Sequence, residues 1–366
     1  MKILLLGEAS NLHWTLAEGL RVLGHDVTVA SAGSGFMANR RNIDLTRNGY
    51  GIGGSVRYLF DILRHLPTFR RYDVVQLSNP VFLHLRPEKN RLVFDYLRRH
   101  NAKIFLDALG TDFYYVTACQ KGAFRYSDFY IDGQLRTYPG CQKTVKAWCS
   151  DPLKSLNRYI AERCDGIAAC LYEYYVSYQN EFPEKLAYLP IPIHLPEDIA
   201  PDNRWGENIP VRFFLGIQRE RSALKGTDIF DEVLQAIQKK YPEECEIKRV
   251  VSLPLSTYLE SMRSSHILMD QLYSYTPATN ALQAMSQGLC AVSGAEPEYY
   301  TFIGENQLHP IFNAIPDSQQ LYTLVENIIK GEKGLPQRCA DSRTFVEKHH
   351  NYIDVARQYL DFWERH

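Results

Sequence analysis

The 366-residue chain lacks long apolar runs. No window approaches the ~18 uninterrupted apolar residues of a membrane-spanning helix. The N-terminal stretch MKILLLGEASN has one lysine and a very short apolar run, whereas a signal peptide needs a longer apolar region and a small-residue cleavage site. With 45% hydrophobic and 23% charged residues, the composition is typical of a globular protein, and we expect a cytoplasmic location.

Closely spaced cysteine pairs are also missing. The eight cysteines are scattered, and no two of them form a Cys-x-x-Cys pair. Because zinc sites usually pair their ligands at short spacing, the four cysteines from Cys141 to Cys170 are better interpreted as reduced structural thiols. The sequence indicates no metal site, and we expect no metal or other cofactor.

A dinucleotide-binding fingerprint is missing too. The stretch GYGIGGS (49–55) satisfies the spacing GxGxxG, but the preceding residues NRRNIDLTRN are polar and do not predict a strand. The first strand–helix turn, GEASNLHW, lacks the glycine spacing of a nicotinamide-dependent dehydrogenase. We interpret residues 49–55 as a flexible loop and a candidate lid.

The formal net charge is only −1, but basic and acidic residues are unevenly distributed along the chain. Residues 1–190 hold 24 Lys and Arg against 18 Asp and Glu, and the remainder holds 17 against 24. A basic first half predicts contact with something anionic, and solvated surface charge explains it equally well. One candidate is peripheral contact with an anionic membrane at its inner face. The paired arginines of this half are Arg40, Arg41, Arg70, Arg71, Arg98 and Arg99.

Strands and helices alternate along the chain. Strands are predicted at 2–6, 26–31, 73–78, 103–109, 165–170 and 186–193, with helices at 14–23, 56–66 and 94–100 between them. A polar linker or hinge follows at 194–210, and the alternation restarts with strands at 211–217, 247–253, 266–272 and 289–292, and helices at 227–239, 256–264, 317–330 and 341–365. This pattern predicts an α/β fold of two domains with parallel sheets.

We place the domains at residues 1–195 and 205–345, with a closing C-terminal helix at 346–366. Ligands of such sheets bind beyond the carboxyl ends of the strands, here in the cleft between the domains.

A basic loop follows the first strand of the second domain, in FFLGIQRERSALKGTDIF (213–230). The strand ends near Gly216, and Arg219, Arg221 and Lys225 come before the next helix. Two guanidinium groups and an ammonium group at the carboxyl end of a strand can neutralise a diphosphate leaving group. The alternative is a solvated basic loop.

The stretch YSYTPATNALQAMSQG (273–288) supplies a second element. Pro277 predicts a turn, Thr279 or Asn280 is expected to cap a helix, and Gly288 ends that helix. The helix N-terminus would present backbone N–H groups to phosphate or sugar oxygens.

Together these two stretches resemble the donor domain of GT-B nucleotide-sugar glycosyltransferases, in particular the retaining family 4. The resemblance implies two Rossmann-like domains facing across a cleft, with the C-terminal helix closing back toward the first. It also implies transfer of a sugar, with retention, from a nucleotide-sugar donor to a glycan or lipid-linked acceptor in cell-surface polysaccharide synthesis.

The resemblance assigns donor-binding roles. Lys225 and Arg221 would bind the diphosphate, with Arg219 nearly as suitable as Arg221. The family uses a Glu-x7-Glu pair near the sugar and the ribose, but this chain has Tyr275 and Gln283 there. Gln283 can still bond to a ribose through its amide, and Tyr275 can stack or donate one bond. The donor set is completed by Gly216, Thr279, Asn280 and Glu298.

Other acidic residues leave alternatives open. Glu296 and Glu298 could simply begin a helix or could contact the nucleotide. Asp270 could swing toward the ligand, although a core or capping role suits it better. The missing acid pair leaves two interpretations: an enzyme with altered donor binding, or a catalytically silent partner subunit that binds a nucleotide or glycan.

The first domain is expected to bind the acceptor. Its candidates are Gly7, Asn11 and His13 in the loop after the first strand, and Asp112 in the turn ALGTDFYY (108–115). Asp112 could assist as a general base or cap the following segment, and His13 could face the cleft or begin a helix. The aromatic, basic stretch 113–148 could recognise a sugar or pack in the core.

Overall fold

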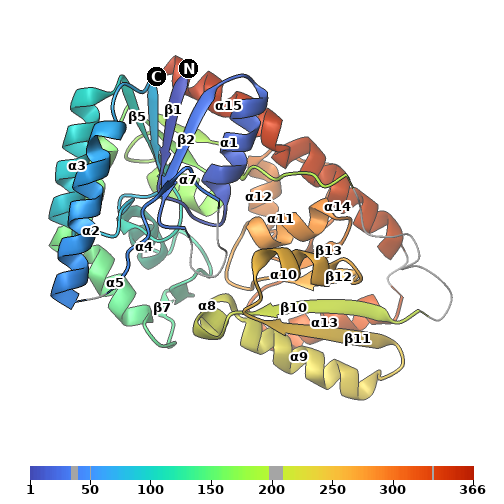
Figure 1. Ribbon diagram of the computed structural model, residues 1–366. Coiled ribbons are helices and arrows are strands. Elements are labelled where there is room, and N and C mark those ends of the chain that lie inside the picture. Colours follow the sequence, from blue (N-terminus) through green and yellow to red (C-terminus); the bar gives the residue numbers. More distant parts are fainter. Residues whose placement is uncertain (34–39, 50, 198–208, 332–333) are drawn as a thin grey trace. The chain divides into compact units, whose positions relative to one another are not determined.

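The computed structural model describes residues 1–33, 40–49, 51–197, 209–331 and 334–366 (Figure 1). Contacts divide the chain into two compact units. The first consists of Met1–Ala123, Gly140–Pro192 and Tyr352–His366, and the second of Phe124–Pro139 and Ile193–Asn351. Most of the predicted hinge, residues 198–208, lies outside the described residues.

A seven-stranded parallel sheet forms the centre of the first unit. Its order is β3-β2-β1-β4-β5-β8-β9, so the chain adds strands on one side of β1 and then on the other. The strands are β1 (Lys2–Leu6), β2 (Asp26–Ser31), β3 (Ile43–Asp44), β4 (Val74–Leu77), β5 (Lys103–Ala108), β8 (Gly166–Ala169) and β9 (Leu186–Tyr188). This order creates a switch point between β1 and β4, where ligands of doubly wound sheets bind.

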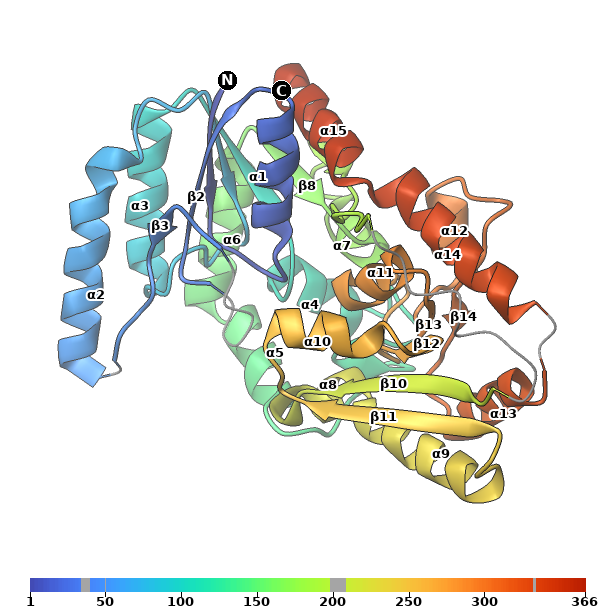
Figure 2. The same cartoon turned by 45° about the vertical axis from the view of Figure 1, so that its right-hand side comes forward.

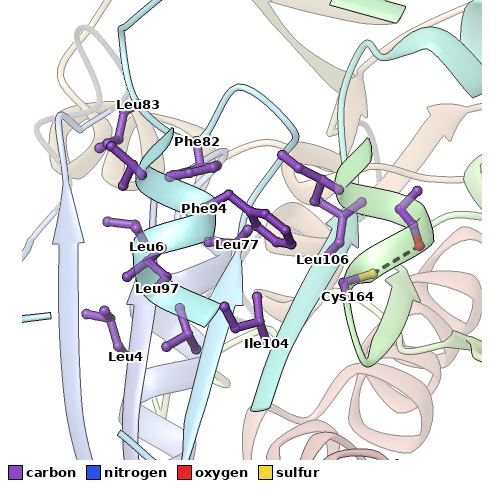
Figure 3. Close-up of a cluster of buried hydrophobic side chains, with 14 of the residues drawn as sticks. Leu4, Leu6, Leu77, Phe82, Leu83, Phe94, Leu97, Ile104, Leu106 and Cys164 are labelled. Atoms are coloured by element: carbon purple, nitrogen blue, oxygen red, sulfur yellow. Dashed lines mark hydrogen bonds between the residues drawn. The ribbon is translucent and has the colours of Figure 1, made fainter. Parts of the chain in front are cut away.

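Helices cover both faces of this sheet because its strands are apolar on both sides. In β1, Leu4 and Leu6 pack toward one helix layer, whereas Ile3 and Leu5 pack toward the other. Figure 3 shows Leu4 and Leu6 in the cluster that also holds Phe94. The first layer contains α2 (Gly51–His65), α3 (Pro87–His100), α6 (Asp151–Arg163) and α7 (Tyr172–Tyr178), and the second contains α1 (Leu12–Val22) and α15 (Tyr352–Arg365).

The C-terminal helix returns to the first unit, as the resemblance implies. Helix α15 packs along α1 (Figure 2), and Lys103 Nζ donates to the Trp363 carbonyl at 2.7 Å. The single helix expected at 341–365 is wrong, however. Helix α14 (Leu335–His350) stops before α15 starts, because the chain at Asn351 leaves the helical conformation and pairs with Ile193.

The second unit has a five-stranded parallel sheet in the order β11-β10-β12-β13-β14. Its strands are β10 (Val211–Ile217), β11 (Cys245–Val251), β12 (Ile267–Met269), β13 (Cys290–Ser293) and β14 (Phe312–Asn313). One face packs on α9 (Thr227–Lys240) and α13 (Ser318–Ile329), and the other on α10 (Leu255–Met262) and α11 (Thr279–Ser286). The switch point lies between β10 and β12.

The stretch 113–148, without helical periodicity in the sequence, forms helix α4 (Phe113–Gln120), a hairpin of β6 (Tyr130–Ile131) and β7 (Gln134–Leu135), and helix α5 (Cys141–Cys149). Residues 124–139, which include the hairpin, belong to the second unit. The predicted domain range 1–195 therefore differs from the structure in this segment, which we call the hairpin segment.

The loop predicted at 49–55 is wrong from Gly51 onward. Residues from Gly51 onward form the first turn of α2, a 15-residue helix. The glycines misled the prediction because glycine is a poor helix former. Among the described residues, no helix has both the length and the apolar character needed to cross a membrane.

Candidate functional site

Three cations follow β10 at the carboxyl edge of the second sheet. Arg219 and Arg221 are exposed in a short 3-10 helix (Arg219–Arg221), and Lys225 is half-buried at the end of α8 (Ser222–Lys225). None of them forms an ion pair within the described part of the chain. Because no carboxylate neutralises them, these groups are available to an anionic ligand such as a diphosphate.

The backbone of Lys225 is fixed to the loop after β12. Its carbonyl accepts the Leu272 N–H at 3.0 Å. Gly226 has φ +77°, and a Cβ at this position would lie 2.8 Å from Leu272 Cδ1. A side chain at position 226 would therefore be strained and would push the two loops apart. The contact places Lys225 at the switch point between β10 and β12.

Arg136 of the hairpin segment holds α8 from the other side. Its guanidinium donates to the carbonyls of Ala223 at 2.6 Å and Leu224 at 3.1 Å. The same guanidinium lies 3.1 Å from the centre of the Tyr273 ring. Carbonyls at the end of a short helix lack partners of their own, so a charged donor there stabilises the turn that carries Lys225.

The N-terminus of α11 lies after β12, as predicted, but its cap differs. The cap residue is Ala278, and no side chain caps the helix, so the expected cap by Thr279 or Asn280 is wrong. Asn280 instead donates through Nδ2 to Asp270 Oδ1 at 3.0 Å. Without a side-chain cap, the first backbone N–H groups of α11 are directed to whatever occupies the carboxyl edge of the sheet.

Asp270 is a structural residue at the end of β12. It is buried, and its second carboxylate oxygen accepts the Ser293 hydroxyl at 3.1 Å. Bonds to Asn280 and Ser293 join three neighbouring segments of the carboxyl edge. These contacts agree with the structural role favoured for Asp270. They do not agree with a movement of its carboxylate toward a ligand.

Tyr275, expected to contact the donor sugar, is turned toward the hairpin segment. Its hydroxyl accepts the backbone N–H of Arg125 at 2.8 Å, and its ring packs between Phe124 and Tyr126. Only 3% of the residue is exposed, and burial raises the pKa of its hydroxyl. The position that carries a carboxylate in the resembled family is here a packing residue.

The two acids at the start of α12 (Pro297–Phe302) also contact the hairpin segment. Arg125 pairs with both Glu296 and Glu298, and the Tyr126 hydroxyl donates to Glu296. Asn313 Nδ2 donates to Glu296 at 2.9 Å. The helix-start position of Glu298 is confirmed, and its carboxylate is engaged by Arg125 rather than open to a nucleotide.

Two further predicted donor residues have different surroundings. Gly216 lies inside β10, and a Cβ there would collide with the Tyr258 ring, so this glycine permits close packing rather than direct binding. Gln283 lies half-buried in α11, one turn after its N-terminus. Its placement keeps it a candidate for ribose binding.

The first unit has a cavity of ≈ 280 Å³ at the carboxyl ends of β1, β4 and β5. Gly7 and Glu8 line it from the β1 end, Ser78 and Asn79 from the β4 end, and Thr111 from the segment after β5. This is the switch point of the first sheet, and its mixture of hydroxyl, amide and carboxyl groups suits a polyhydroxylated ligand. Gly7 therefore lies beside this cavity, and its role toward an acceptor stays a prediction.

Asn11 and His13 do not line this cavity. Asn11 caps α1 in a left-handed conformation with φ 65°. His13 is fully buried, with Nε2 2.8 Å from Asp107 Oδ2 and Nδ1 2.8 Å from the Gly7 carbonyl. Burial alone would lower the pKa of His13, but the hydrogen bond and charge of Asp107 outweigh it and raise that pKa. His13 lies in the first turn of α1, which agrees with the helix-start alternative, and this cavity gives no support to an acceptor role for either residue.

Asp112 caps α4, one of its two predicted roles. Oδ1 accepts the Tyr115 N–H at 2.8 Å, and Oδ2 accepts the Tyr178 hydroxyl at 2.7 Å. Burial raises the pKa of Asp112 to about 6. Asp112 is only 1% exposed and does not line the cavity described above, so its carboxyl group is not placed to receive a proton from a ligand in that cavity.

Glu8 is the acid that does lie at the cavity. Its two oxygens accept the backbone N–H groups of His13 at 3.2 Å and Trp14 at 3.0 Å. Burial raises the pKa of Glu8 to about 7, despite the opposing effect of His13. A carboxyl group that titrates near neutrality beside a cavity is able to exchange a proton there.

Arg125 and Arg136, which hold the donor-side loops, were not among the residues predicted from the sequence. One signal was available: Asp132-Gly133 is a dipeptide typical of two-residue hairpin turns. In the structure it separates Tyr130–Ile131 from Gln134–Leu135, and both turn residues have positive φ, as a type I′ turn requires. That signal predicts the hairpin. It does not show which unit the hairpin joins, because the contacts span about 150 residues of sequence.

Comparisons with solved structures identify the fold. The sucrose-phosphate synthase of Thermosynechococcus elongatus matches with a TM-score of 0.66 and 11% identity, over 100% of this chain and 99% of that chain. The HepE protein of Anabaena, solved with UDP and glucose, matches with a TM-score of 0.62 and 11% identity, over 99% and 98%. This chain has the GT-B fold.

A third GT-B structure, the lipopolysaccharide outer core galactosyltransferase WaaB, matches with a TM-score of 0.53 and 12% identity, over 99% of each chain. No protein-family model and no curated protein matches the sequence. At these identities the likeness establishes two Rossmann-like units of the GT-B type, and the chemistry has to be inferred from the site.

Proposed function

We propose that the protein is a glycosyltransferase that transfers a sugar from a nucleotide-sugar donor to a glycan or lipid-linked acceptor, with retention, in cell-surface polysaccharide synthesis. The observation that supports this most directly is the unpaired basic loop of Arg219, Arg221 and Lys225 at the switch point of the second unit. The uncapped N-terminus of α11 lies at the same edge of that sheet.

In this proposal the second unit binds the donor. Lys225 and Arg221 neutralise the diphosphate as the sugar leaves, which lowers the barrier by stabilising the charge that develops. The first N–H groups of α11 bind phosphate or sugar oxygens, and Gln283 bonds to the ribose. HepE, with the same fold, was solved with UDP-glucose, so a uridine diphosphate sugar is the first donor to test.

The first unit binds the acceptor in the cavity beside Gly7, Glu8 and Thr111. A hydroxyl of the acceptor would bond to these groups. Glu8 replaces Asp112 as the candidate that assists proton removal, because Glu8 lines the cavity and Asp112 does not. No step in this proposal uses a metal ion.

One observation favours a second function, that of a catalytically silent partner subunit. Tyr275 stands where a carboxylate would approach the sugar, and its hydroxyl is bound to the hairpin segment. Glu296 and Glu298 are bound by Arg125. Such a protein would still bind a nucleotide or glycan through the basic loop, but it would not transfer the sugar.

A thermal-shift screen followed by calorimetry tests the proposal. The probes are UDP-, GDP-, ADP-, CMP- and dTDP-linked sugars, with Lys225→Ala and, as a matched control, the exposed Lys239→Ala at the end of α9. We expect one nucleotide class to bind, Lys225→Ala to weaken that binding at least about tenfold, and Lys239→Ala to leave it unchanged. Binding without sugar release over long incubation with candidate acceptors favours the silent subunit, and no binding by any donor contradicts both functions.

A further inference from the structure

Helix α2 carries an exposed apolar stripe. Ile52, Val56, Phe60 and Leu63 are 87%, 63%, 66% and 53% exposed, although each is a large apolar side chain. At about 100° per residue, the four lie within roughly 80° of arc on one side of the helix. They extend over roughly 16 Å of helix length. Side chains of this kind are normally buried, and a continuous exposed row marks a contact surface.

The stripe is not a fault of packing, because the opposite side of α2 is properly buried. Tyr58 and Ile62 face the first core of the sheet and are almost inaccessible to solvent. The helix therefore has a defined inner face, and the stripe points away from its own unit. In Figures 1 and 2, α2 lies at the outer side of the first unit, beside α3.

Basic side chains adjoin the stripe along one side and at its N-terminal end. Arg57 and Arg64 are exposed on the adjoining side of α2, and the last turn carries Arg64 and His65. At the N-terminal end, a groove of ≈ 570 Å³ has Ile52 and Val56 in its wall. Three cations line this groove: Arg47, Arg86 and Lys89.

We propose that the α2 stripe and the adjoining basic groove are the surface by which the protein docks on an anionic lipid bilayer. The helix lies in the plane of the membrane, its four apolar side chains enter the boundary between headgroups and acyl chains, and the cations bind lipid phosphates. The paired arginines noted in the sequence contribute only general attraction, since Arg41 and Arg98 are bonded to Asp44 and Asp165.

Charge distinguishes this occupant from a second copy of the chain. Two copies that paired through the stripe would bring Arg57 and Arg64 of each copy close to those of the other, and like charges would oppose the contact. A bilayer with anionic headgroups satisfies the same cations. It also accepts an apolar row without requiring a complementary groove.

The groove adjoins the cavity at the switch point, because Tyr58 and His84 line both. A lipid that enters the groove from the bilayer would thus reach the cavity within the same unit. If the protein is the transferase proposed above, its acceptor is then lipid-linked. Docking itself does not depend on that proposal.

Vesicle flotation tests the docking surface with the full chain. The probes are vesicles of phosphatidylcholine alone and of phosphatidylcholine with phosphatidylglycerol. We expect salt-sensitive binding to the anionic vesicles, and a loss of about tenfold or more for the double variant Val56→Asp/Phe60→Asp. The matched control is Val22→Asp, since Val22 is 61% exposed at the end of α1 on the opposite face of the sheet. It should bind as the unmodified chain does.

A second measurement reports insertion directly. Phe60→Trp should be quenched by brominated phosphatidylcholine in anionic vesicles, and Val22→Trp should not. Circular dichroism and thermal melting verify that each variant is folded, and Val56→Ser/Phe60→Ser replaces the double variant if the aspartates disturb α2. Equal binding by the double variant and the unmodified chain, or no binding to anionic vesicles, overturns the proposal. The proposal is also overturned if sedimentation velocity shows a dimer of the unmodified chain that the double variant no longer forms, while the double variant still binds vesicles. Nucleotide binding measured on the same samples keeps this outcome separate from the proposed function.

Discussion

Arg125 forms ion pairs with Glu296 and Glu298, two carboxylates that lie 171 and 173 residues further along the chain. Its backbone N–H also donates to Tyr275. Through these contacts a segment from the first half of the sequence is joined to the donor-side edge of the second unit. The carboxylates nearest the expected donor site are therefore used for structure.

Arg125→Ala should destabilise the second unit. The Glu296 side chain is only 7% exposed, so removal of the guanidinium leaves this buried carboxylate with its neutral hydrogen-bond partners Tyr126 and Asn313 alone. We expect a loss of about 1–3 kcal/mol in the free energy of unfolding at neutral pH, measured by urea denaturation. Arg99→Ala, an exposed change in α3, serves as the control.

The pH dependence gives this prediction a second readout. Arg125 lowers the pKa of Glu298, so the pair stabilises the fold above the usual glutamate pKa of about 4.5 and loses that effect as the pH falls through the lowered value. The difference between Arg125→Ala and the unmodified chain should shrink in acid. A constant difference from pH 7 to pH 3 would mean that the guanidinium acts only by packing.

Arg136→Ala should weaken donor binding without abolishing the fold. The guanidinium holds the carbonyls of Ala223 and Leu224, directly before Lys225. Without it we expect about a tenfold rise in the donor dissociation constant, corresponding to one charge-assisted hydrogen-bond site, with little change in melting temperature. Calorimetry with the donor found in the screen measures the effect.

The ring contact of Arg136 supplies a matched pair of controls. Tyr273→Phe keeps the ring beneath the guanidinium and should bind the donor normally, whereas Tyr273→Leu removes the ring and should resemble Arg136→Ala in part. If Arg136→Ala binds donor as the unmodified chain does, Lys225 is positioned by the Leu272 contact alone.

Asp112→Asn should change how stability depends on pH. The pKa of Asp112 is raised from its usual 3.8 to about 6, so the folded unit binds this proton more tightly than the unfolded chain does. Its contribution to stability is therefore present below about pH 4 and is lost as the pH rises through about 6. The asparagine oxygen can still accept the Tyr115 N–H, so the cap persists.

We expect the melting temperature of Asp112→Asn to fall less than that of the unmodified chain between pH 4 and pH 7, while Asp112→Ala is about 1 kcal/mol less stable than Asp112→Asn at every pH because the cap is absent. The raised pKa values of Glu8 and His13 also make the fold less stable as the pH rises, in the variant and in the unmodified chain alike. The melting temperature of Asp112→Asn should therefore still fall somewhat with pH. Parallel pH profiles for Asp112→Asn and the unmodified chain would contradict the prediction.

The sequence predicts regular elements well where burial dictates a simple pattern. The strands β1, β2 and β10 have the predicted bounds because each is a short apolar run beside a turn. The basic loop and α11 also lie where the resemblance places them. These features depend on local sequence, which composition and spacing report directly.

The errors concern contacts between distant segments. Nothing local in Tyr275 shows that its hydroxyl binds Arg125, and nothing local in His13 shows that Asp107 binds its ring. Asp112 illustrates the same point, since the same residue type suits a general base and a helix cap. Only the position of Tyr178 and the burial of the carboxylate decide between the two roles.

Gln283 occupies the position where the resembled family has an acid, and changing this residue tests the donor site most directly. If the amide binds the ribose, Gln283→Glu should retain or improve donor affinity, because a carboxylate accepts hydroxyl bonds roughly twice as strong as neutral ones. Gln283→Leu should lose about 1–3 kcal/mol of donor affinity, since a ribose hydroxyl is left without a partner. Calorimetry with the screened donor measures both.

The structure also narrows how this experiment can turn out. A neighbouring acid could have taken over the missing carboxylate's role, in which case Gln283→Glu would abolish binding by repulsion. Asp270 is bonded to Asn280 and Ser293, however, and Glu298 is paired with Arg125. Both candidate acids are therefore engaged elsewhere, and neither is left to repel a second carboxylate beside Gln283. The added charge of Gln283→Glu should then be tolerated. If both substitutions leave the binding of the screened donor unchanged, Gln283 has no part in the donor site.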